Sequence, residues 1–134
     1  FVVSAAGPVS NFLLAAIGIA LLIGIRVTRP EALGDLLDAL RGSRFAPGAL
    51  APVTYLLFWF VMVNVSLGVF NLIPIPPLDG SGVAVSIFGA SLARVYAKIA
   101  PFGFLILILL ISSRALGTLF RPFQTLVFRL VFGA

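Results

Sequence analysis

The hydrophobic pattern divides the chain into long apolar runs and one polar stretch. Apolar residues fill 9–25 and 53–71 with few interruptions, and a shorter, still more apolar run covers 99–112. Helices over the first two runs would be about 25 and 28 Å long, close to the roughly 30 Å hydrocarbon core of a bilayer. The pattern therefore predicts three apolar helical spans.

The polar stretch, 26–52, separates the first two spans. Within it, PEALGDLLDALRG has the spacing of a short amphipathic helix, with Pro30 at its start and Gly42 after its end. We interpret 26–52 as a solvated connector at the membrane surface.

Three prolines interrupt the chain directly after the second span. Pro74, Pro76 and Pro77 remove backbone donors, and each disfavours helix in the residue before it. A helix is expected to resume over 80–98. Non-helical backbone at membrane depth is tolerated only where it is buried in protein or lines a cavity, so we expect the broken segment to be enclosed by other helices.

The last segment, 113–134, has the pattern of an amphipathic helix. Its basic and hydroxyl side chains fall on one helical face: Arg114, Thr118, Arg121, Thr125 and Arg129. Leucines and a phenylalanine lie opposite. This arrangement predicts a tail that lies in the membrane interface and is kinked or restarted at Pro122.

Composition supports the membrane assignment. Hydrophobic residues make up 61% of the chain and charged residues 10%, and the mean hydropathy is +1.22. A soluble domain contains roughly 45–50% apolar residues. The net charge of +5 comes from basic residues at segment ends, which suits lipid headgroups and argues against a nucleic-acid partner. We predict an all-α, polytopic membrane helix bundle with one membrane domain over 1–134, embedded in the lipid bilayer.

Asp79 is the one acidic residue outside the polar stretch. A carboxylate at the centre of a membrane helix costs about 2.5–3.5 kcal/mol, so it normally has a cation, a metal or a proton pathway as a partner. Arg94 and Lys98 lie about four turns further along the same predicted helix, too far to pair with it. Aspartate before glycine is also common in turns and helix caps. Both a turn and a metal ligand remain possible, and an oxygen donor alone identifies no metal.

Two motifs carry a family resemblance. FNLIPIPPLDG contains N-x-x-P-x-x-x-x-D-G, and SAAGPVSNF contains G-x-x-x-N. The motif residues are Asn71, Pro74, Asp79 and Gly80 in the first, and Gly7 and Asn11 in the second. In this order, each beside an apolar run, they resemble the site-2 protease family of intramembrane zinc metalloproteases.

The resemblance implies a role for each motif residue. Asp79 would be the third protein ligand of Zn²⁺, beside two histidines of an H-E-x-x-H motif whose glutamate is the general base. Asn71 would donate a hydrogen bond to the scissile carbonyl as it becomes an oxyanion. Asn11 would orient the substrate or shape helix packing, and Gly7, Pro74 and Gly80 would shape the site. The substrate would be a transmembrane protein whose helix must partly unwind, and the location a prokaryotic cell membrane.

The chain departs from the family pattern because it contains no histidine. It begins at Phe1 without a methionine, and we expect the histidines and the general base to lie upstream. The 134 residues alone should therefore be inactive. Two other functions stay open: a non-catalytic membrane homologue with a binding or regulatory role, and a transporter-like protein with a site at its broken helix.

Overall fold

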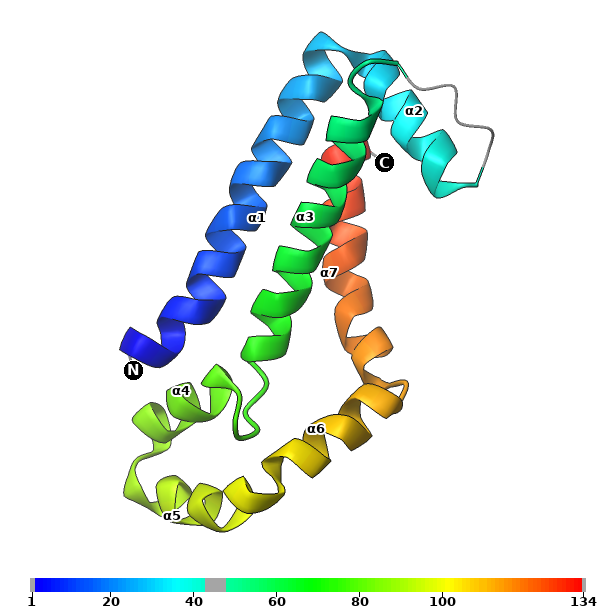
Figure 1. Ribbon diagram of the computed structural model, residues 1–134. Helices are drawn as coiled ribbons and strands as arrows, with labels where there is room; N and C mark the ends of the chain where they lie inside the picture. The colour runs from blue at the N-terminus through cyan, green and yellow to red at the C-terminus, as the bar shows by residue number, and fades with distance from the viewer. Residues whose placement is uncertain (1, 43–47, 134) are drawn as a thin grey trace.

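The computed structural model describes residues 2–42 and 48–133, and these ranges are mostly helical. The helices are α1 (Val2–Thr28), α2 (Pro30–Leu40), α3 (Ala51–Asn71), α4 (Asp79–Phe88), α5 (Ala90–Ile99), the 3₁₀ turn η1 (Ala100–Phe102), α6 (Gly103–Ser112) and α7 (Ala115–Phe132). Helices α1, α3 and α7 run lengthwise together, and α4, α5 and α6 cross beneath one end of them (Figure 1). The predicted all-α bundle is confirmed.

Three helical stretches in the described ranges are long and apolar enough to cross a membrane. They are Val2–Thr28, Ala51–Asn71 and Ala90–Ser112. The first two contain the runs predicted at 9–25 and 53–71. The third combines α5, η1 and α6, so it starts nine residues before the predicted run at 99–112.

The core lies where α1 packs along α3. Gly18 of α1 is buried, and a side chain there would meet Val61 of α3. Further along the same interface, the ring of Phe12 lies against Gly68. Small residues allow two helices to approach closely, which is why these two glycines lie at the contact. Asn64, the buried amide of α3, donates from Nδ2 to its own helix at the Phe60 carbonyl (2.8 Å).

Helix α2 forms where the amphipathic pattern predicts it. Its apolar face, with Leu33 and Leu36 buried, packs into the core between α1 and α3. Gly42 follows the helix with a positive φ of 72°. Part of the predicted connector, residues 43–47, lies outside the described residues.

The predicted single helix over 80–98 is wrong. The chain turns at Gly89, whose φ is 74°, and this separates α4 from α5. A left-handed backbone conformation ends a helix, and glycine adopts it without the strain that a Cβ causes. Arg94 and Lys98 therefore lie on a different helix from Asp79.

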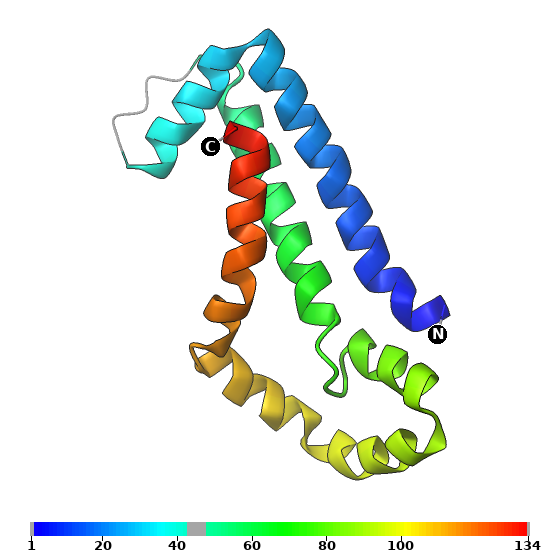
Figure 2. The ribbon, with the colours of Figure 1, turned by 180° about the vertical axis from the view of Figure 1, so that it is seen from behind.

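The tail also differs from the prediction. Helix α7 runs lengthwise beside α3 and does not lie apart from it as a surface helix (Figure 2). It continues through Pro122 without a restart. Val127 and Val131 are buried, and the rings of Phe128 and Phe58 meet edge to face with centroids 5.7 Å apart. The apolar face of the tail thus finds a partner in the aromatic surface of α3, which a single-helix pattern does not reveal.

Candidate functional site

The broken segment lies between the end of α3 and the start of α4. Residues 72–78 form irregular turns, and the Pro76–Pro77 peptide bond is cis. The chain folds back so tightly that the carbonyl groups of Leu72 and Ile73 fill the space in front of Gly80. A side chain at position 80 would collide with this backbone, so the glycine of the D-G motif is a steric requirement.

Asp79 is the first residue of α4 and is half-buried. Its carboxylate, through Oδ2, lies directly against Gly7 of α1, where a Cβ would collide with it. A second contact reinforces this approach, because the Ser4 hydroxyl fills the space in front of Gly82. The starts of α1 and α4 are therefore packed together, as Figure 1 shows.

The position of Asp79 at a helix start has an electrostatic consequence. The first turn of a helix carries a partial positive charge from its unpaired N–H groups, which stabilises a nearby carboxylate by about 0.3–1 kcal/mol. Ser81 in the same turn directs its hydroxyl to the Leu78 carbonyl (2.7 Å) and not to the carboxylate. The fold thus places the Asp79 carboxylate where the helix start stabilises its negative charge, and the Ser81 hydroxyl is engaged elsewhere.

The two asparagines of the motifs lie on α1 and at the end of α3. Asn11 lies one turn after Gly7 on α1, and Asn71 is the last residue of α3. Both are half-buried. In the described part of the chain neither amide hydrogen-bonds to Asp79. The structure therefore joins Gly7 to Asp79 directly and places the asparagines on the helices that lead to this contact.

Comparison with known proteins decides the family. Residues 1–111 match the sequence profile of peptidase family M50, which includes the site-2 proteases. The chain belongs to this family. It is 30% identical over 108 residues to "Putative zinc metalloprotease YwhC" of Bacillus subtilis (strain 168), an alignment that covers 81% of this chain and 43% of that protein. The chain thus spans about two fifths of the relative's length. No solved structure matches it.

Family membership confirms the resemblance seen in the two motifs. Together with the three apolar helices, it identifies the M50 chain as a multi-pass membrane protein. Helix α7 starts at Ala115 and lies beyond the matched residues.

The donor groups of the M50 chain alone do not fit a zinc ion. The sequence has neither histidine nor cysteine, and over residues 2–42 and 48–133 no three acidic side chains come together. Zinc in proteins takes three or four protein ligands. The chain offers one suitable donor at the site, the half-buried carboxylate of Asp79.

Two residues that hold the broken segment are missed by the sequence analysis. The hydroxyl of Tyr96, on α5, donates to the Pro74 carbonyl (2.8 Å). Gly103, at the start of α6, packs against the Pro76 carbonyl and the Pro77 ring. A tyrosine that is partly buried, as Tyr96 is, usually finds a hydrogen-bond partner, but the sequence does not identify which one.

Proposed function

We propose that this M50 chain is part of an intramembrane zinc metalloendopeptidase that hydrolyses peptide bonds of membrane-spanning proteins. The observation that supports this proposal most directly is the contact of the Asp79 carboxylate with Gly7. It brings the D-G motif and the G-x-x-x-N motif, which are distant in the sequence, to one place. A residue that only formed a local turn would not need this contact.

In this proposal Asp79 supplies one of three zinc ligands. The other two, and the general base, belong to residues outside the 134 described by this sequence. The named zinc metalloprotease that the chain matches is more than twice as long as the aligned region, which leaves room for them. Zinc, when bound, would supply the Lewis acid for hydrolysis.

The chain's own residues would orient the zinc-binding carboxylate and bind the substrate. The first turn of α4 and the bare backbone at Gly7 fix the direction of the Asp79 carboxylate. Asn71, at the end of α3, would donate its amide to the carbonyl oxygen of the scissile peptide as negative charge develops there. The substrate would be a transmembrane helix that unwinds locally, since its backbone groups are otherwise paired internally. A prokaryotic cell membrane is the proposed location.

Substitution of Asp79 in the full-length protein tests this function. Asp79→Asn keeps the size and the capping ability of the side chain but removes its charge. We expect zinc content to fall and cleavage of a membrane-spanning substrate to drop to background, with little change in thermal stability. Asp38→Asn, an exposed acid of α2, is the matched control and should change neither.

A second variant distinguishes the proposed zinc ligand, Asp79, from the proposed oxyanion donor, Asn71. Asn71→Ala should lower turnover by roughly 10²–10³ and leave zinc bound. Normal cleavage by Asp79→Asn with its zinc intact would refute the ligand role, and so would unfolding of that variant. A full-length wild-type protein that binds zinc but cleaves no membrane-spanning substrate would instead support a non-catalytic homologue.

A further inference from the structure

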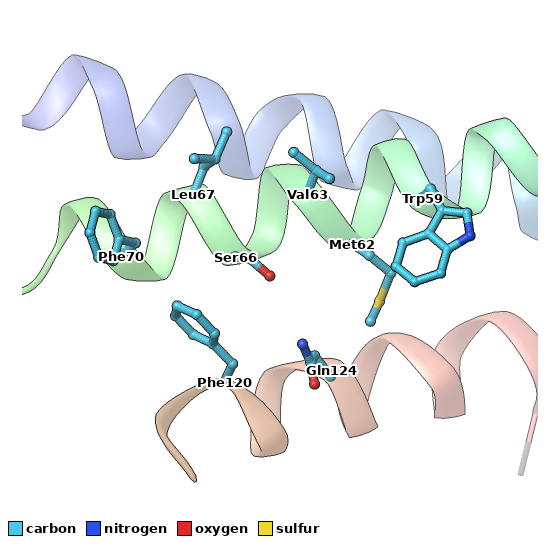
Figure 3. A pocket seen from close by; sticks show the side chains of 8 residues that line it. All are labelled: Trp59, Met62, Val63, Ser66, Leu67, Phe70, Phe120 and Gln124. Carbon is cyan, nitrogen blue, oxygen red and sulfur yellow. The ribbon is translucent and has the colours of Figure 1, made fainter. Parts of the chain in front are cut away.

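A groove runs between α3 and α7 and reaches the C-terminal end of α3, next to the broken segment. It has a volume of about 270 Å³ and is lined mainly by apolar side chains. Phe70 of α3 and Phe120 of α7 lie at one end, and Met62 lies towards the other (Figure 3). Ser66 and Gln124 point into it from the two helices (Figure 3). We refer to this feature as the α3–α7 groove.

A second hollow of about 460 Å³ continues the groove along α7. The two share Met62 and Gln124, so they form one continuous surface. The second hollow is basic: it is lined by Arg121, Thr125 and Arg129. These three residues are spaced four apart and therefore lie on one face of the helix.

The positive charge of this hollow has no counterpart on the helices that form it. Neither α3 nor α7 contains an acidic residue. The four acids of the chain are Glu31, Asp35 and Asp38 on α2 and Asp79 on α4. Because α7 packs along an apolar span, Arg121 and Arg129 lie beside membrane-exposed surface, where charged side chains normally pair with an opposite charge.

The shape and chemistry of the groove point to one class of ligand. Guanidinium groups match phosphate with two parallel hydrogen bonds, and basic pockets between membrane helices suit anionic headgroups. The adjoining apolar part, from Met62 to Phe70, offers a surface of the kind that an acyl chain covers. We propose that the α3–α7 groove binds an anionic phospholipid, with its phosphate between Arg121 and Arg129 and an acyl chain along the apolar part.

This proposal is independent of the proteolytic function. Arg121 and Arg129 lie beyond the residues that match the peptidase family and far along the sequence from the two motifs, and only the apolar end of the groove, at Phe70, adjoins the motif residue Asn71. The lipid would tie α7 to α3, and its loss would leave the Asp79 contact unchanged.

Lipid retention by the purified full-length protein tests the proposal. The protein in mild detergent is mixed with phosphatidylglycerol or phosphatidylcholine, and bound lipid is counted by native mass spectrometry. We expect wild-type protein to retain phosphatidylglycerol preferentially. Arg121→Gln/Arg129→Gln should lower that retention by roughly ten- to thirtyfold, as expected for the loss of two basic contacts. Arg94→Gln/Lys98→Gln removes the same charge from exposed sites on α5 and should retain the lipid.

A third variant tests the acyl-chain part without changing charge. Ser66→Phe should fill the groove and reduce retention of the same lipid, whereas an excess of inorganic phosphate should not displace it. Equal retention of the two lipids, or equal loss in the α5 control, would mean diffuse attraction and overturn the site. If the α7 variant keeps the lipid but loses association with another protein segment or a second copy, the groove binds protein and the lipid proposal fails.

Discussion

The Asp79 carboxylate occupies the space in front of Gly7 that any side chain at position 7 would need. The glycine and the aspartate come from the two motifs that the sequence sets far apart, and each explains the other. Gly7 gives the carboxylate room to lie against α1, and the start of α4 holds the carboxylate there. The glycine of the first motif thus makes room for the aspartate of the second because it has no side chain.

Gly7→Ala should therefore displace Asp79. The added Cβ would overlap with the carboxylate, so the acid must turn away or α4 must shift. In the full-length protein we expect lower zinc content and lower proteolysis. The loss would occur even though alanine favours helix more than glycine does. Gly24→Ala on the same helix is the control, because nothing lies within 4 Å of the new Cβ. It should stabilise the protein by about 0.5–1 kcal/mol and leave zinc content unchanged. Unchanged zinc in Gly7→Ala would contradict the steric role.

Much of this arrangement follows from the sequence. The apolar runs predict the spans, and the prolines predict the non-helical segment at 72–78, because both depend on local chemistry. The two motifs place Gly7 and Asp79 in one site. Their direct contact depends on how α1 and α4 meet, and no local pattern contains that information.

The predictions of one helix over 80–98 and of an interfacial tail failed for the same reason: both features depend on how helices pack, which no local pattern contains. Gly89 ends α4 through a backbone conformation that glycine allows but does not dictate. The pattern of α7 describes an apolar face correctly, yet that face packs on Phe58 of α3 as readily as it would lie on lipid. The Tyr96 hydroxyl reaches Pro74 only because the turn at Gly89 brings α5 back towards the break.

The close contact of α1 with α3 predicts the effect of a methyl group at Gly18. A Cβ there meets the Val61 side chain in the core. Gly18→Ala should destabilise the protein by about 1–3 kcal/mol, as overpacking of a close interface does. Gly34→Ala on α2 meets nothing within 4 Å and should have the opposite sign. Unfolding in mixed detergent micelles gives both values. A stabilised Gly18→Ala would show that α1 and α3 can separate without cost.

Tyr96→Phe tests whether α5 braces the broken segment. The change removes one hydrogen bond, to the Pro74 carbonyl, and keeps the ring. We expect a loss of stability of about 0.5–1.5 kcal/mol and faster hydrogen exchange of residues 72–78. Tyr55→Phe on α3 is a matched substitution at an exposed position and should affect neither. If exchange in the break is the same in both variants, the proline segment is held by Gly103 and its own turns alone.

The end of α7 depends on a single arginine of α1. Arg26 donates from Nη1 to the carbonyl oxygens of Leu130 (3.2 Å) and Val131 (3.0 Å), the last turn of the helix. Gly133 follows in a left-handed conformation, with its bare backbone against the guanidinium. The arginine thus satisfies carbonyl groups that a helix end leaves unpaired and adds a favourable charge at the negative end of the helix.

Arg26→Gln should consequently free the C-terminal turn of α7. Hydrogen bonds from a charged donor contribute about 1.5–3 kcal/mol, so we expect a loss of stability in that range and faster hydrogen exchange near Val131. Arg114→Gln at the opposite end of α7 is the control. A positive charge at a helix start is unfavourable, so its removal should leave stability unchanged or raise it slightly. Equal effects of the two substitutions would mean that loss of charge, and not the capping bonds, determines the result. Protection of α7 that survives Arg26→Gln would assign its attachment to the packing of Phe128 on Phe58 alone.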